Sequence, residues 1–219
     1  MITAYKFLTP QMTSYNNFQW EIGKEYTIDK PGNEMCSKQV FHCYNNPLLA
    51  EFMMPLHISF IVDYDLYKIE VPEFVNDDGL KFVSKSQKVI EKIERPIITA
   101  EQRTEIAIRV AKLNCKNKNW NEWAYKWLTG EDRTKSSAST ATAYAAYDAA
   151  YATAYAAYAT AYAAYDAAYA ADFDAYYVNY VDSNAHYAAY AAKTSVGCFS
   201  DKDEFNKKLI EIIEMVCKK

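Results

Sequence analysis

The chain has 219 residues, of which 51% are hydrophobic and 24% are charged, and its formal net charge is −4. This length is enough for one large domain or two small ones, and the apolar fraction is enough for a core. The absence of any basic run argues against nucleic acid as a partner.

The five cysteines indicate a reducing compartment. Their number is odd and no pair has C-x-x-C spacing, which argues against a disulfide framework and a zinc site. The N-terminus lacks the apolar stretch of a signal peptide. The longest uncharged helical run, 17 residues between Asp148 and Asp166, is short for a membrane span. We therefore expect a cytoplasmic protein with no membrane partner, metal or cofactor.

Residues 1–97 predict a small β-rich domain. All six prolines and three of the five glycines lie here, and short apolar runs are separated by turn residues. Asn46 and Pro47 predict the start of a helix over 48–53. The predicted strands are 2–8, 17–22, 25–28, 40–44, 58–62, 67–71, 80–84 and 87–93.

Residues 98–219 predict an all-helical region, which makes the fold class α+β. Thr99 and Gln102 have the spacing of a capping box. Three tryptophans on one face of a second helix are typical of a core contact, and Gly130 ends or bends that helix. Ser200 with Asp203 predicts the start of a terminal helix over 201–217. The expected buried residues of the three helices are Ile106, Val110, Leu113, Trp120, Trp123, Trp127, Phe205, Leu209, Ile212, Ile213 and Val216.

Thirteen of the 20 tyrosines lie between Tyr144 and Tyr190, in an alanine-rich segment. Eleven aromatic residues there have a mean spacing of 3.6, the period of a straight α-helix rather than a coiled-coil seam. Alanine favours the helix, so we predict one long helix over about 136–181 with a stripe of rings. The candidate binding or assembly residues are Tyr144, Tyr147, Tyr151, Tyr155, Tyr158, Tyr162, Tyr165, Tyr169, Asp148 and Asp166.

The sequence YAAYDAAYA recurs in this helix after 18 residues, so Asp148 and Asp166 share one angular position. A helix with so little charge is expected to pack its surface against other helices. These helices belong either to the same chain or to a second copy of it. The stripe is therefore either a packing face or an aromatic surface for a ligand or partner. We expect a homo-oligomer through this helix, a break at 182–184, and a short helix over 185–192.

No motif for phosphate, dinucleotide, metal or acyl-transfer chemistry is present. The three histidines, His42, His57 and His186, are far apart in sequence. His42 is adjacent to Cys43, and adjacent strand residues face opposite sides, so these two alone do not form a nucleophile–base pair. We expect His42 to be a hydrogen-bonded strand residue and Cys43 a small buried one.

The run FQWEIGKEY over 18–26 is the most specific motif of the chain. Weaker motifs are Tyr5-Lys6, Phe41-His42-Cys43, Asn46-Pro47-Leu48 and Val83-Ser84-Lys85. With these motifs, roughly residues 1–95 resemble a domain of unknown function found mainly in phage and bacterial proteins. Many relatives continue into tryptophan-containing helices and alanine-rich arrays. The resemblance implies a phage or prophage accessory protein, and it implies no activity.

A looser likeness concerns the order of elements. A strand with Tyr5, then a strand with His42 leading into a short helix, is similar to the layout of ADP-ribosyltransferases, which place an Arg or His, a Tyr or Ser, and a Glu around NAD. The likeness implies Tyr5, His42 and Glu70 as catalytic candidates, with Glu91 as the other strand glutamate. It is an analogy at the level of the fold.

We expect a non-enzymatic phage-type accessory protein that acts by binding or assembly, against a host defence or other host factor. One alternative is an ADP-ribosyltransferase-like enzyme. The other is a nucleotide sponge whose tyrosines stack nucleobases.

Overall fold

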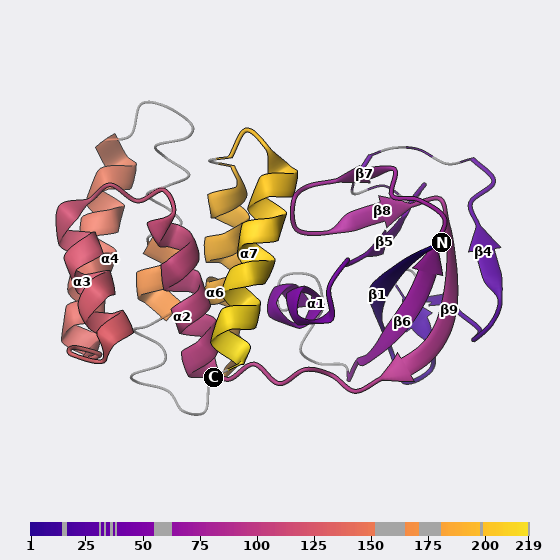
Figure 1. The fold of residues 1–219 in the computed structure, drawn as a ribbon, viewed down its shortest axis with the longest axis horizontal. Coiled ribbons are helices and arrows are strands. Elements are labelled where there is room, and N and C mark those ends of the chain that lie inside the picture. Colours follow the sequence, from indigo (N-terminus) through magenta and orange to yellow (C-terminus); the bar gives the residue numbers. More distant parts are fainter. Residues whose placement is uncertain are drawn as a thin grey trace. The chain divides into compact units, whose positions relative to one another are not determined.

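The computed structural model describes residues 1–14, 17–30, 32, 34–35, 37, 39–54, 63–151, 165–170, 181–197 and 199–218, and the backbone alone for 146–151 and 181–185. The chain divides into two compact units, one ending at Ile97 and one running from Ile98 onward. The first contains the strands and one short helix, and the second contains the other helices (Figure 1). The expected α+β fold class is therefore confirmed.

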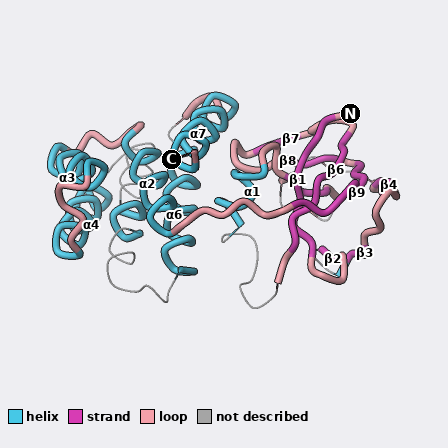
Figure 2. Tube along the Cα trace, turned by 60° about the horizontal axis from the view of Figure 1, so that its bottom comes forward, coloured by secondary structure: helices cyan, strands magenta, loops and turns pink. Residues whose placement is uncertain are grey.

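The described strands of the N-terminal unit form antiparallel sheets, magenta in Figure 2. The largest has the order β1-β6-β9-β4, and the smaller ones are β2-β3 and β5-β8-β7. The elements are β1 (Ile2–Leu8), β2 (Thr13–Ser14), β3 (Phe18–Gln19), β4 (Glu25–Thr27), β5 (Phe41–Cys43), α1 (Pro47–Met53), β6 (Asp65–Val71), β7 (Asn76–Asp77), β8 (Phe82–Ser84) and β9 (Ser86–Ile93). The predicted strand over 17–22 is shorter than expected, and the one over 58–62 lies outside the described residues.

The large sheet has a core on one face because its strands alternate. Ala4 and Leu8 of β1 share that face with Ile69 of β6, and all three are fully buried. Two backbone hydrogen bonds between Tyr5 and Tyr44, with N···O distances of 2.8 and 2.9 Å, join β1 to the end of β5. The two sheets that carry β1 and β5 therefore share one core.

Helix α1 packs against β1 and is tied to the chain after β9. The Asn46 side chain accepts a hydrogen bond from the backbone N–H of Leu48 at 2.8 Å, which confirms the predicted cap. Arg95 donates to both carboxylate oxygens of the buried Glu51, each at 3.0 Å, and to the Tyr64 carbonyl at 3.2 Å. This bidentate pair holds α1 in place.

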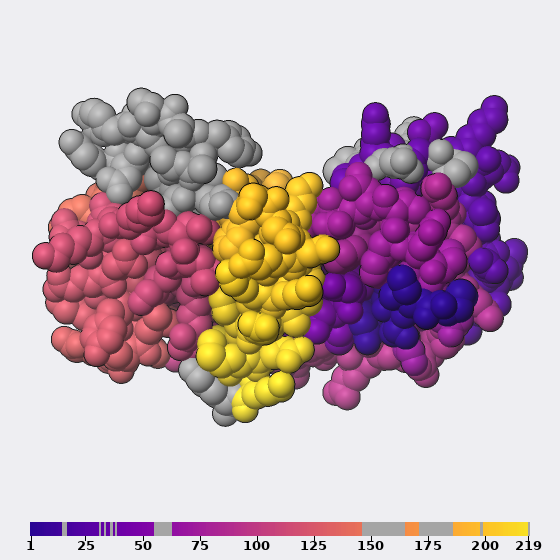
Figure 3. Space-filling view, turned by 45° about the horizontal axis from the view of Figure 1, so that its top comes forward, coloured from indigo at the N-terminus to yellow at the C-terminus, as the bar shows by residue number. Residues whose placement is uncertain are grey.

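The helices of the second unit pack in two groups. Helices α6 (Val181–Val196) and α7 (Lys202–Cys217) contact α2 (Ala100–Lys112), and α3 (Lys118–Thr129) contacts α4 (Lys135–Tyr151). Residues 165–170 are also helical. In Figure 3 the C-terminal residues, which include α7, form a continuous yellow band.

Most predicted helix details are confirmed. Thr99 and Gln102 make both hydrogen bonds of the capping box, and the three tryptophans of α3 are at most 6% exposed. Two details are wrong. Leu113 is 40% exposed because it caps the C-terminus of α2 rather than continuing its buried face. The N-cap of α7 is Asp201 rather than Ser200, and its side chain accepts from Glu204 N–H at 3.0 Å.

The predicted long helix is described only in part. Helix α4 ends its described course at Tyr151, and residues 152–164 and 171–180 lie outside the described residues. The expected break at 182–184 is wrong, because α6 runs without interruption from Val181 to Val196. Four alanines of α6 are fully buried, so packing outweighs the preference of Asp, Ser and Asn for helix ends.

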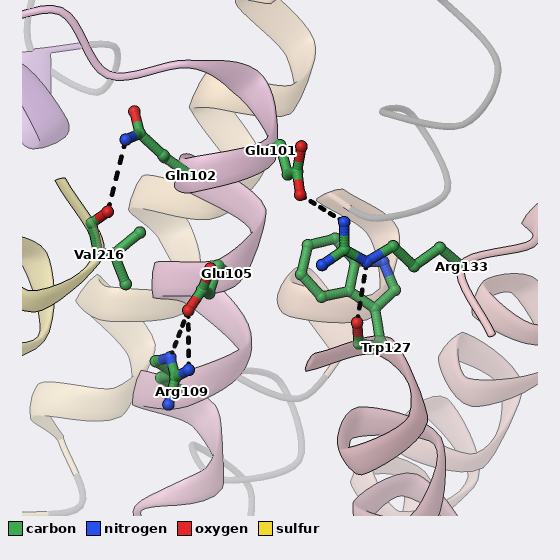
Figure 4. A network of polar contacts seen from close by, with 7 residues as sticks. All are labelled: Glu101, Gln102, Glu105, Arg109, Trp127, Arg133 and Val216. Carbon is green, nitrogen blue, oxygen red and sulfur yellow. Dashed lines mark hydrogen bonds and ion pairs between the residues drawn. The ribbon is translucent and has the colours of Figure 1, made fainter. Parts of the chain in front are cut away.

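A polar network joins α2 to the C-terminal end of α3 (Figure 4). The Arg133 guanidinium lies 4.5 Å from the centroid of the Trp127 ring, and its Nε donates to the Trp127 carbonyl at 2.9 Å. Its Nη1 donates to the Glu101 carboxylate. Arg133 therefore satisfies a carbonyl at the end of α3 and links it to the first turn of α2.

Candidate functional site

The three catalytic candidates lie on separate strands. In the β1–β6 register Tyr5 is opposite Lys68 and Thr3 is opposite Glu70, so Tyr5 and Glu70 share one sheet face. His42 lies on β5, and its Nε2 hydrogen-bonds to the Met35 carbonyl. Within the described part of the chain, no recorded hydrogen bond joins these three side chains to one another.

The partner of His42 defines its role. Burial lowers the pKa of His42, and the Met35 carbonyl opposes that shift, so the imidazole is neutral at pH 7. Cys43, next to it, is buried as expected, and burial raises the pKa of its thiol to about 12. These two residues have the character of structural strand residues.

Lys6 is the residue of this unit that sequence reasoning missed. Its Nζ lies 5.0 Å from the centroid of the Trp20 ring and 6.0 Å from that of Phe41, and it donates to the His42 carbonyl at 2.7 Å. Burial lowers the pKa of Lys6 to about 8. The signal was present in the sequence, because Lys6 alternates with Ala4 and Leu8 on the buried face of β1.

The motif residues of the N-terminal resemblance converge around Lys6. The rings of Phe18, Trp20 and Phe41 lie 4.9–5.4 Å apart from one another. The side chain of Gln87 donates to the same His42 carbonyl at 3.4 Å and to Ser84 Oγ at 3.0 Å. Lys6 therefore lies between an aromatic cluster and a buried polar group.

These converging residues coincide with a family match. Residues 2–101 match a family model described as "Domain of unknown function (DUF7666)". The N-terminal part of the chain is therefore similar to this domain of unknown function. The expected resemblance to a domain of unknown function is confirmed, and the buried lysine lies inside the matched segment. No curated protein matches the chain, and no solved structure matches it.

The tyrosine stripe follows the matched segment in the chain, and the structure describes part of the stripe. Tyr144 is 38% exposed on α4. Tyr165 and Tyr169 are half-buried, and their rings stack at a centroid distance of 5.6 Å and an interplanar angle of 13°. Tyr169 meets Tyr187 of α6 edge to face at 4.5 Å. The other candidate side chains lie outside the described residues: Tyr147, Tyr151, Tyr155, Tyr158, Tyr162 and Asp148.

Asp166 is a buried carboxyl beside this ring contact. It is 7% exposed, and desolvation raises its pKa to about 7. Its helical neighbours Ala167, Ala168 and Ala170 are fully buried. This piece of the stripe is therefore packed within the chain.

Among the described residues, no group of three or more His, Cys, Asp or Glu side chains could hold a metal ion. None of the helices in the described ranges is long and apolar enough to cross a membrane.

Proposed function

We propose that the chain is a non-enzymatic, phage-type accessory protein that acts by binding and assembly through its alanine/tyrosine helices. The observation that carries the proposal is the contact of Tyr169 with Tyr187 on α6, 4.5 Å between ring centroids, next to fully buried alanines on both segments. Small residues allow close approach of helix backbones, and each tyrosine buries a large area. Packing such a surface against another helix is therefore energetically favourable.

The same contact sequence occurs twice. Residues 165–170 read Tyr-Asp-Ala-Ala-Tyr-Ala, and residues 147–152 read the same. The second copy packs against α6 through Tyr169. The first copy, which begins on α4, carries the same chemistry and suits an α6-like helix of another molecule. We therefore assign a second copy of this chain as its partner, and a host protein with an alanine/tyrosine helix is the other outcome of the test.

The phage-type assignment rests on the resemblance carried by the FQWEIGKEY motif; the family match over residues 2–101 is to a domain of unknown function. The rival enzyme requires His42 near a carboxylate in a pocket. The imidazole Nε2 is instead committed to the Met35 carbonyl, so the geometry favours binding. The nucleotide sponge is tested by titration, and we expect no thermal shift with nucleotides.

The test replaces the first copy of the contact sequence. We expect Tyr147→Ala with Tyr151→Ala to lower the molar mass measured by light scattering from that of an oligomer to that of a monomer, because the rings that dock on the partner are removed. Tyr125→Ala is the matched control, since Tyr125 is 59% exposed on α3 and lies outside the stripe. It leaves the oligomer intact. A monomeric wild-type chain that also captures no host protein would contradict the proposal.

A further inference from the structure

A cavity lies between α3 and α4. Its volume is about 400 Å³, which is within the range of small-molecule sites, roughly 300–1,000 Å³. One wall is a helical face of α3 that includes Asn119, Trp123 and Lys126. The facing side of α4 has small residues, Ser137 and Ala141. The cavity exists because these short side chains leave room beside the tryptophan.

The wall of this cavity contains one buried donor and several polar side chains. Trp123 is 6% exposed, and its fully buried indole N–H has no hydrogen-bond partner among the described residues. A buried donor without an acceptor is costly and calls for an explanation. The Asn119 amide, the Ser136 hydroxyl and the Tyr144 hydroxyl also line the cavity. Their set contains both donors and acceptors.

The charges of the cavity disfavour an anion. Lys126 Nζ is paired with Glu122 at 3.2 Å, so its charge is balanced. Asp132 Oδ1 accepts from the backbone N–H of Thr134 at 3.0 Å and from Ser137 Oγ at 3.0 Å. These hydrogen bonds lower the pKa of Asp132, so an ionised carboxylate already occupies the N-terminal end of α4.

We propose that α3 and α4 hold a binding site for a small uncharged polyhydroxyl compound of the size of a mono- or disaccharide. A hydroxyl group both donates and accepts, which matches the mixed set of the Asn119 amide and the Ser136 and Tyr144 hydroxyls. The exposed ring of Tyr144 offers an apolar face to the C–H side of such a ligand. Tyr144 is shared with the tyrosine stripe, so binding is measured both on the wild-type chain and on the Tyr147→Ala/Tyr151→Ala variant; oligomeric state tests the assembly and ligand binding tests the cavity.

The test follows the ¹⁵N–¹H resonance of the Trp123 indole, assigned with Trp123→Phe, during titration of the full chain. The probes are glucose, galactose, N-acetylglucosamine and maltose, with glucose 6-phosphate as the anionic and spermidine as the cationic comparison. We expect at least one neutral sugar to move this resonance saturably. Thr140→Trp, at an exposed position on the cavity wall, should weaken binding at least about tenfold by filling the space.

Ala143→Trp is the matched control. It places the same ring on α4 at an exposed residue outside the cavity lining, and binding should stay unchanged. Three results would overturn the proposal. They are no response to any neutral sugar, equal weakening by both variants, and a response to spermidine or glucose 6-phosphate without one to the sugars.

Discussion

Lys6 has an unusual environment for a lysine in the N-terminal unit. It is 8% exposed, and its ammonium is surrounded by Trp20, Phe41 and the His42 carbonyl. The cation–π contacts and the hydrogen bond offset part of the desolvation cost, but the lowered pKa shows that burial outweighs them. Charged Lys6 therefore lowers the stability of the folded domain relative to a neutral side chain.

The lowered pKa of Lys6 predicts how the stability of the N-terminal unit changes with pH. The pKa of Lys6 falls from 10.5 to about 8 on folding, so between these values the unfolded chain binds more protons and the free energy of unfolding rises with pH. Urea denaturation should show wild type gaining roughly 3 kcal/mol relative to Lys6→Met across this window. Lys24→Met, at an exposed lysine, is the control and should show no such gain. Parallel curves for wild type and Lys6→Met would contradict the prediction.

Asp166 predicts the opposite pH dependence of stability. Its folded pKa is about 7 against 3.8 ordinarily, so the folded state binds more protons between these values and stability falls as pH rises through this window. Asp166→Asn should raise the melting temperature at pH 8 and have little effect at pH 4. Asp203→Asn, at an exposed position of α7, should change neither. Equal effects of Asp166→Asn at both pH values would refute this assignment.

At the scale of elements, the junction of α2 and α3 depends on Arg133. Trp127 is 2% exposed beneath the guanidinium. Arg133→Ala should lower the free energy of unfolding of the helical unit by about 1–2 kcal/mol, because the stacking contact and the cap of the Trp127 carbonyl are both lost. Arg133→Lys keeps the positive charge but loses the planar guanidinium group. It should lower the free energy of unfolding by about half as much as Arg133→Ala.

The control for Arg133 is Glu101→Gln. The ion pair with Glu101 is largely exposed, so its removal should cost less than about 1 kcal/mol. Amide hydrogen exchange in the first turn of α2 and the last turn of α3 measures all three variants. If Glu101→Gln were as damaging as Arg133→Ala, the ion pair rather than the stacking would hold the junction.

The elements also show what sequence can predict. The capping box at Thr99 and the Asn46–Pro47 start are local patterns, and both are present as predicted. Helix α6 was mispredicted because the signal at 182–184 is local, whereas its burial against α2 comes from residues far away in sequence. The burial of Lys6 could be inferred from the alternation of β1, but its surroundings could not, because they combine β1, β5 and the FQWEIGKEY segment.

At the scale of the whole molecule, the alanine/tyrosine helices remain the feature that points to function. The 3.6-residue spacing predicted a ring stripe, and Tyr165, Tyr169 and Tyr187 make ring contacts where the structure describes them. The sequence left open whether the stripe packs internally or binds a partner. The second repeat is buried within the chain and Tyr144 is exposed, so internal packing is observed for one part of the stripe, and partner binding by the first repeat is our proposal. The cavity beside Trp123 was not predictable, because it depends on which face of α4 meets α3.

Sedimentation velocity of the unmodified full chain, over a wide range of concentrations, tests the central claim most directly. Assembly through the alanine/tyrosine helices predicts a sedimentation coefficient that rises with concentration. It also predicts that Tyr147→Ala with Tyr151→Ala abolishes that rise while the melting temperature is retained. A single monomeric species at every concentration, with no difference between wild type and this variant, would contradict assembly through these helices.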